Sequence, residues 1–188
     1  MPVIKNKKIW PDFWSDKTCV MGVLNVTPDS FSDGGKYFSH NSAIERASQM
    51  INEGADVIDI GAQSTRPGAE IIGSDEELDR LIPVLKSIRY NHPEIIISID
   101  TFQSKVASKA LDIGANWIND VSGGRYDPFM LDVVSSSQCP YILMHSRGNS
   151  KTMSSLTSYK NITLDVISQL LLSTEKAISK GIDNSKII

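Results

Sequence analysis

The sequence EGADVIDIG (residues 53–61) contains the pattern that decides the fold: a glycine, a short link, and an apolar run that gives way to polar residues. The same order returns in DIGANWIND (112–120) and in KGIDNSKII (180–188). Each copy follows a segment in which apolar residues recur at helical spacing. Strands that alternate with helices in this way predict parallel βαβ units, and the weak alternation within the runs fits strands that are covered on both faces.

Working outward from this repeat, helical periodicity predicts helices at 42–53, from Ser74 past Pro83, and at 103–113, 128–137 and 161–180. We expect Ser42 and Ser74 to be N-caps, each paired with a glutamate three residues later, and Pro83 to kink or weaken its helix. Strands are expected in the run that ends at Asn25 and at 56–61, 95–100, 116–121 and 141–145. Residues 186–188 look like the start of a sixth strand, the alternative being a frayed terminus.

Sequence period alone does not distinguish an open doubly wound sheet from a TIM barrel. A barrel typically needs about 250 residues, and this chain of 188 residues stops inside an apparent strand. We therefore expect a single α/β domain over residues 1–188, an incomplete TIM (β/α)8 barrel with about five βα units and the start of strand 6. A barrel left open in this way is expected to have low stability and little activity by itself.

Composition excludes several classes of protein. The chain is 40% hydrophobic and 22% charged with a net charge of −3, which fits a soluble globular domain and argues against a nucleic-acid surface. No segment resembles a signal peptide or a membrane span. Cys19 and Cys139 have no metal-ligand spacing and are too few for a disulfide scaffold, so we expect a cytoplasmic protein that binds neither membranes nor nucleic acid.

Polar residues follow every predicted strand. In a parallel sheet the carboxyl ends of the strands meet at one edge, where ligands bind. For Asp100 the sequence leaves two alternatives, an N-cap of the next helix or a ligand-binding residue. Thr101 could fill the capping role as well. For Asn119 we favour ligand contact, and for His145 a hydrogen-bonded place in the core. The residues at these strand ends are Asn25, Asp59, Asp100, Thr101, Asn119, Asp120, His145, Ser146 and Arg147.

Two loops add to this edge. Ser64, Thr65 and Arg66 precede a Pro-Gly pair, and their hydroxyl and guanidinium donors suit the oxygens of an anion such as phosphate. The long loop LNVTPDSFSDGGKYF (24–38) combines turn residues, two glycines and an isolated Phe31, a combination that favours a lid. The residues alone therefore predict a site for an anionic small molecule that forms hydrogen bonds.

The motifs MGVLNVTPDSFSDGG, DIGAQSTRPGAE, SIDT, INDVSGG and LMHSRGNSKTM, in this order and spacing, resemble those of the dihydropteroate synthase family over essentially the whole chain from Cys19 onward. The resemblance implies a TIM-barrel transferase of folate biosynthesis. Its reaction condenses 6-hydroxymethyl-7,8-dihydropterin diphosphate with 4-aminobenzoate, and releases diphosphate and 7,8-dihydropteroate.

The resemblance also implies residue roles. Asp100 and Asn119 would bind the pterin and, with Arg66, carry the catalysis, while Val121 and Met144 would line the pterin slot. Asn25 would be the ligand of a Mg²⁺ ion bound with the diphosphate. Thr65 and Arg66 would contact diphosphate and the 4-aminobenzoate pocket. The remaining three residues implied are Pro67 and Phe31, which would pack around the aromatic ring, and Asp33 in the mobile first loop.

The match has departures. Position 63 is Gln where many members carry Glu, and the family's later Asp-Pro-Gly, Lys/Ser and Arg/His segments would lie beyond Ile188. A homodimer is expected if the protein is full length. Two alternatives stay open: a pterin-binding methyltransferase barrel, which would not need the STRPG loop, and a non-catalytic pterin-binding fragment.

Overall fold

The computed structural model describes residues 8–27 and 35–188. Its sheet contains five strands, β1 (Met21–Asn25), β2 (Val57–Gly61), β3 (Ile96–Asp100), β4 (Trp117–Asp120) and β5 (Tyr141–Leu143), which pair in the order β1-β2-β3-β4-β5. All four pairings are parallel. A doubly wound sheet reverses its strand order at a switch point. Strict sequence order therefore decides for the barrel type of α/β fold, as predicted.

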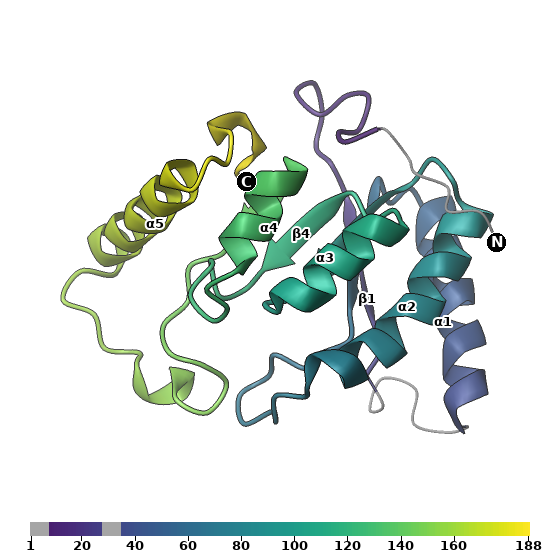
Figure 1. Ribbon diagram of the computed structural model, residues 1–188, viewed down its shortest axis with the longest axis horizontal. Helices are drawn as coiled ribbons and strands as arrows, with labels where there is room; N and C mark the ends of the chain where they lie inside the picture. Colours follow the sequence, from purple (N-terminus) through teal and green to yellow (C-terminus); the bar gives the residue numbers. More distant parts are fainter. Residues whose placement is uncertain (1–7, 28–34) are drawn as a thin grey trace.

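Five α-helices connect and follow the strands: α1 (Gly35–Asn52), α2 (Ser74–Asn91), α3 (Ser104–Ile113), α4 (Met130–Ser137) and α5 (Ile162–Ser179). In Figure 1 they succeed one another in chain order from α1 on the right to α5 on the left. Two short 3₁₀ turns, Met153–Ser155 and Asn184–Lys186, flank α5. Within the described ranges, no helix has the combination of length and hydropathy needed to cross a membrane.

Alternate residues of the strands face two different environments. Ile58, Ile60, Ile97 and Ile99 pack against the helices in the larger core. Val57, Ile96 and Trp117 point to the other face, which corresponds to the barrel interior, and there they meet Trp10 from the segment before β1. Polar residues at the same alternate positions as Val57, Ile96 and Trp117 therefore point into the barrel. This alternation places the side chains of the site on the inner face.

Several predicted boundaries and caps are corrected by the structure. Helix α1 begins seven residues before Ser42, so Ser42 lies inside the helix and caps nothing. Ser74 is the first residue of α2, whose N-cap is Gly73 without a side-chain hydrogen bond, and Glu77 is hydrogen-bonded to Gln103. Helix α2 runs past Pro83, as predicted. The local capping signals were wrong here, and for Glu77 the reason is a tertiary contact that takes its side chain.

The final residues do pair with the sheet. Ile187 forms a parallel bridge with Tyr141, and the backbone N–H of Ile188 donates to the carbonyl of Tyr141 at 2.9 Å. The backbone N–H of Leu143 in turn donates to the carbonyl of Ile188 at 3.0 Å. The predicted sixth strand thus begins beside β5, on the side away from β4.

Candidate functional site

Three predicted site residues lie in one row across the sheet. The strand register aligns Asn25 with Gly61, Gly61 with Asp100, and Asp100 with Asn119, all at the carboxyl ends of their strands. Because neighbouring strands in a sheet lie about 4.8 Å apart, this register brings the three polar side chains to the same level of the inner face. The prediction that strand-end residues gather at one edge is confirmed for this set.

Gly61 allows two polar side chains to approach closely in the middle of this row. A side-chain carbon at Gly61 would lie 3.3 Å from Asp100 Oδ2 and 3.5 Å from Asn25 Oδ1. The absence of a side chain therefore lets a carboxylate oxygen and an amide oxygen come close together over Gly61. The other carboxylate oxygen of Asp100, Oδ1, is buried and has no hydrogen-bond partner among the described residues. A buried acceptor of this kind is available to a ligand that brings donors.

Asp59 lies one layer below the row, two residues before Gly61 on β2. It is 3% exposed, and its Oδ2 accepts a hydrogen bond from Asn119 Nδ2 at 3.0 Å. Sequence reasoning placed Asp59 at a strand end and assigned it no role. Its alternation with Ile58 and Ile60 was the available signal, because a polar residue between two outward isoleucines points into the barrel.

Negative charge accumulates around Asp100. Burial, followed by the charges of three neighbouring carboxylates, raises the pKa of Asp100 to about 7. Burial also raises the pKa of Asp59, where the polar side chains of Ser98 and Asn119 oppose the shift. The Asp100 carboxyl is therefore close to half protonated at neutral pH, and ligand donors or a cation would favour its ionised form. The three neighbouring carboxylates are those of Asp59, Glu77 and Asp120.

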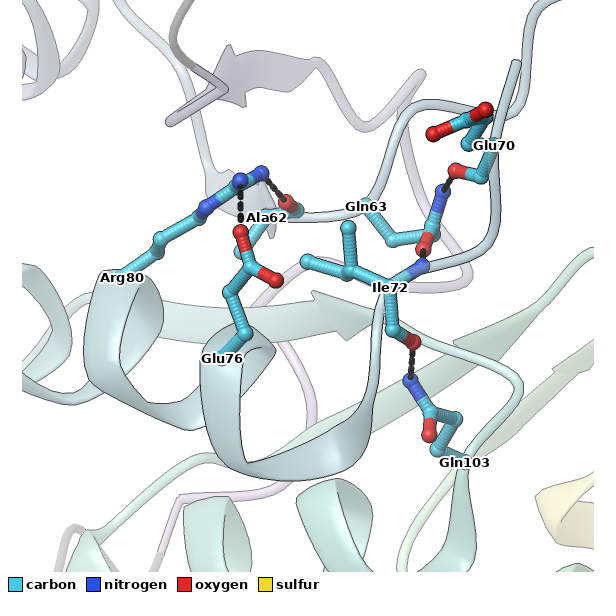
Figure 2. A network of polar contacts seen from close by, with 7 residues as sticks. All are labelled: Ala62, Gln63, Glu70, Ile72, Glu76, Arg80 and Gln103. Atoms are coloured by element: carbon cyan, nitrogen blue, oxygen red, sulfur yellow. Dashed lines mark hydrogen bonds and ion pairs between the residues drawn. The ribbon is translucent and has the colours of Figure 1, made fainter.

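Gln63 holds the loop between β2 and α2 in shape (Figure 2). Its Nε2 donates to the carbonyls of Ser64 at 2.6 Å and Glu70 at 3.0 Å, and its Oε1 accepts from the backbone N–H of Ile72 at 2.8 Å. This side chain is only 4% exposed. One buried amide thus joins both ends of the STRPG loop, a role that sequence reasoning did not assign to the position.

The same loop is tied to the loop after β5. The backbone N–H of Gly68 donates to the carbonyl of Ser150 at 2.8 Å, and Ser150 Oγ donates to the carbonyl of Ala69 at 2.8 Å. Between these anchors Arg66 and Pro67 are exposed and Thr65 is half-buried. Thr65 and Arg66, the predicted hydrogen-bond donors to an anion, therefore lie on a loop held at both ends, and the Arg66 side chain is open to solvent.

Of the remaining predicted residues, some lie within the described part of the chain and others do not. Val121 is half-buried after β4 and Met144 is 43% exposed after β5, at the same edge of the sheet. His145 Nε2 lies 3.1 Å from Gln169 Oε1 of α5, consistent with a structural histidine. Phe31 and Asp33 lie outside the described residues, as does the whole of the predicted lid between Thr27 and Gly35.

The polar atoms closest to Gly61 are oxygens of Asp100 and Asn25. Oxygen is the ligand that a hard cation such as Mg²⁺ prefers. Among residues 8–27 and 35–188, no group of three or more His, Cys, Asp or Glu side chains is arranged to hold a metal ion. Mg²⁺ is usually bound through one or two carboxylates together with substrate phosphates and several waters. The amide oxygen of Asn25 is a neutral oxygen that can join such phosphate and water ligands.

A cavity of about 400 Å³ lies at the opposite end of the strands. It is lined by the segment before β1 and by the turn between α2 and β3, including Phe13, Asn91 and His92. None of the predicted site residues borders it. The candidate site is thus the polar inner face at the carboxyl edge of the sheet.

Comparison with known proteins agrees with this geometry. Residues 21–188 match the family described as pterin binding enzyme. The chain is 54% identical over 180 residues to the mitochondrial folate synthesis bifunctional protein of Arabidopsis thaliana, covering 93% of this chain and 32% of that protein. It is 44% identical over 175 residues to the dihydropteroate synthase of Bacillus subtilis, covering 93% of this chain and 59% of that enzyme.

Solved structures are similar over the same span. A dihydropteroate synthase from Clostridium difficile, determined in the presence of pteroic acid, superposes with a TM-score of 0.84 at 42% identity, covering 92% of this chain and 63% of that one. The Xanthomonas albilineans enzyme with 4-aminobenzoic acid gives a TM-score of 0.84 at 38% identity, covering 92% and 60%. The chain therefore spans about three fifths of these solved structures and a third of the Arabidopsis protein.

Proposed function

Because the chain belongs to the family of pterin binding enzymes, we propose that it supplies the pterin-binding part of a dihydropteroate synthase. The proposed reaction joins 6-hydroxymethyl-7,8-dihydropterin diphosphate to 4-aminobenzoate, and it releases diphosphate and 7,8-dihydropteroate. The observation that carries the proposal is the row of Asn25, Asp100 and Asn119, in which oxygens of Asn25 and Asp100 come close together over Gly61. We further propose that residues 1–188 form one domain, since a single continuous sheet joins all five strands.

Asp100 and Asn119 are the proposed pterin-binding residues. A carboxylate accepts hydrogen bonds from the amino group and ring N–H of an aminopyrimidine, while an amide both donates and accepts. Asp100 Oδ1 is a buried oxygen without a partner among the described residues, which suits a ligand that brings its own donors. Val121 and Met144, at the same edge, are proposed to line the slot around the flat ring.

Thr65, Arg66 and Pro67 are proposed to form the outer part of the site. Arg66 is exposed on a loop braced by Gln63 and Ser150, so its guanidinium can form charge-assisted hydrogen bonds with an incoming anion. Thr65 adds a hydroxyl donor, and Pro67 a rigid apolar surface for the aromatic ring. Phe31 and Asp33 complete the proposal on the first loop, outside the described residues.

Asn25 is proposed to hold a Mg²⁺ ion through Oδ1. When bound, the ion would neutralise charge on the diphosphate leaving group. Asn25 itself orients that end of the substrate above Gly61. Asp100 Oδ2 also lies close to Gly61. We therefore expect the pterin and diphosphate ends of the substrate to meet between Asn25 and Asp100.

The chemistry proposed for these residues is substitution with early departure of the leaving group. The bond between the pterin methylene carbon and the diphosphate oxygen breaks, and the electron pair leaves with diphosphate. Arg66 and Thr65 stabilise the departing charge, while the Asp100 carboxylate stabilises the pterin methylene cation. The amine of 4-aminobenzoate then forms the C–N bond and loses a proton. The protein acts through charge and positioning, without a covalent intermediate on a side chain.

A direct assay tests this proposal. The full-length protein is incubated with both substrates and Mg²⁺, and 7,8-dihydropteroate is quantified by chromatography. Asp100→Asn and Arg66→Ala should each reduce kcat/KM by at least about tenfold, because each removes a charge used in the transition state. The matched controls Asp112→Asn and Lys109→Ala, exposed on α3, should leave it unchanged. Near-normal rates in both site variants would contradict the assignment.

The alternatives give different results in the same samples. Methyl transfer from methyltetrahydrofolate without diphosphate release would establish a methyltransferase barrel. Pterin binding without turnover would establish a non-catalytic fragment. Homodimerisation and a cytoplasmic location remain proposals, and the Arabidopsis relative named mitochondrial makes the compartment a separate question for cell fractionation.

A further inference from the structure

Asp59 is a buried carboxylate that the proposed reaction does not use. Its side chain lies on β2 between the apolar bottom of the inner face and the row that contains Asp100 and Asn119. It is 3% exposed. Its Oδ2 accepts the hydrogen bond from Asn119 Nδ2 at 3.0 Å, and its Oδ1 is buried. A carboxylate at this depth needs an explanation.

We propose that Asp59 is a positioning residue, which fixes the amide of Asn119 so that the amide oxygen is left for the pterin ring. This inference rests on the proposed function, since it concerns how Asn119 meets the ligand. It adds a residue for which neither the family resemblance nor the strand-end pattern predicted a role.

The chemistry of the two groups fixes the orientation. An ionised carboxylate only accepts hydrogen bonds, so the Asn119 side chain must turn its nitrogen toward Asp59. The oxygen and nitrogen of an amide have nearly the same size, and without a directing partner the group can rotate by 180° at little steric cost. With Asp59 in place, Asn119 keeps one acceptor for a ligand N–H. The pair thereby selects a heterocycle that presents a donor at this point.

Stability does not account for Asp59. Burial raises its pKa, and its charge also faces Asp100, an arrangement that costs folding free energy. A buried charge is costly unless it is paired, and no described cation pairs with Asp59. Functional sites commonly contain residues that lower stability. A buried Asp59 that orients a ligand-binding amide agrees with such a trade-off.

The test is a double-mutant cycle on the full-length protein. Calorimetry measures binding of 6-hydroxymethylpterin to the wild type, Asp59→Ala, Asn119→Ala and the double variant, with Asp79→Ala on the exposed side of α2 as the matched control. Asp59→Ala should weaken binding at least about tenfold in the wild-type background and less than about twofold when Asn119 is already alanine. Asp59→Asn, whose amide oxygen can still accept from Asn119, should recover part of the affinity. The thermal midpoint of Asp59→Asn should equal or exceed that of the wild type.

Two results overturn the inference alone: equal losses from Asp59→Ala in both backgrounds, or unchanged affinity in Asp59→Ala while Asn119→Ala binds weakly. A wild-type protein that binds pterin but forms no dihydropteroate contradicts the proposed reaction and leaves the cycle measurable. A wild-type protein that binds no pterin contradicts both proposals.

Discussion

Asp100 is the residue on which the electrostatics of the site converge. Its position at the end of β3 could be predicted from the sequence, because a polar residue after a buried run marks the edge of a parallel sheet. Two of its three carboxylate neighbours, Asp59 and Asp120, were also expected at this edge, but Glu77, from the first turn of α2, was not. Which side chains share a low-dielectric environment depends on strand register and helix packing. The raised pKa of Asp100 is therefore a property of the folded chain.

This environment predicts how the stability of the ligand-free protein depends on pH. A carboxyl whose folded pKa is about 7, against 3.8 for the ordinary group, binds protons more tightly in the folded state. Its stabilising contribution is complete below pH 4 and is lost as the pH rises through 7. The loss can reach about 4 kcal/mol for a shift of this size. Urea unfolding at pH 5 and pH 8 should show the wild type less stable at pH 8.

Asp100→Asn supplies the comparison for this measurement. The variant removes the titrating group and should flatten the difference between pH 5 and pH 8, although Asp59 and Glu77, whose pKa values burial also raises, will retain part of it. Asp112→Asn, exposed on α3, should keep the wild-type slope. Equal slopes in Asp100→Asn and the wild type would show that Asp100 titrates near its ordinary value.

Among the elements, the strands followed the sequence more closely than the helix starts. The glycine repeat placed β2 and β4 within a residue or two, because a buried strand has few alternative places. Helix α3 shows why starts were harder to predict. Neither Asp100 nor Thr101 caps it, and its first N–H, that of Ser104, donates to Asp127 Oδ2 at 2.7 Å from the loop after β4. A cap supplied from 23 residues away leaves no local signal.

The loop between β2 and α2 gives the prediction at this scale. Gln63→Met keeps the length of the side chain but removes hydrogen bonds to Ser64, Glu70 and Ile72. We expect a loss of about 1–3 kcal/mol in unfolding free energy and a raised KM for 4-aminobenzoate, because Arg66 and Pro67 lose their support. Denaturation and steady-state kinetics measure the two effects. Gln49→Met, exposed on α1, is the control. An unchanged KM in Gln63→Met would mean that the shape of this loop does not affect the binding of 4-aminobenzoate.

Over the whole molecule, the strands run from an apolar end to a polar end. Apolar inner residues and the tryptophan cluster lie at the amino ends, and the row around Gly61 lies at the carboxyl ends. This polarity is the usual division in barrel proteins, where one end carries chemistry and the other carries stability. The repeat predicted the parallel sheet but did not decide its strand order. That order became clear only from the pairing of the strands, because either α/β architecture satisfies the same alternation of elements.

The division predicts that stability can be reduced at one end without loss of binding at the other. Trp10 packs against Trp14 and Trp117 with ring centroids 4.7 and 5.5 Å away. The same segment is anchored by Trp117 Nε1, which donates to the carbonyl of Ile9 at 2.6 Å. Trp10→Ala should remove about 2 kcal/mol or more of stability through lost apolar contacts. Binding of 6-hydroxymethylpterin at a temperature where the variant is folded should be unchanged.

Thermal denaturation and calorimetry on the same samples separate the two effects. Trp10→Phe, which retains an aromatic ring in the cluster, should recover most of the stability, and Tyr90→Ala, an exposed aromatic on α2, should lose little. Equal stability of Trp10→Ala and the wild type would mean that the segment before β1 does not contribute to the inner core. A fall in pterin affinity in a fully folded Trp10→Ala sample would show that the two ends of the strands are coupled, because the row around Gly61 would then depend on the packing of the layers below it.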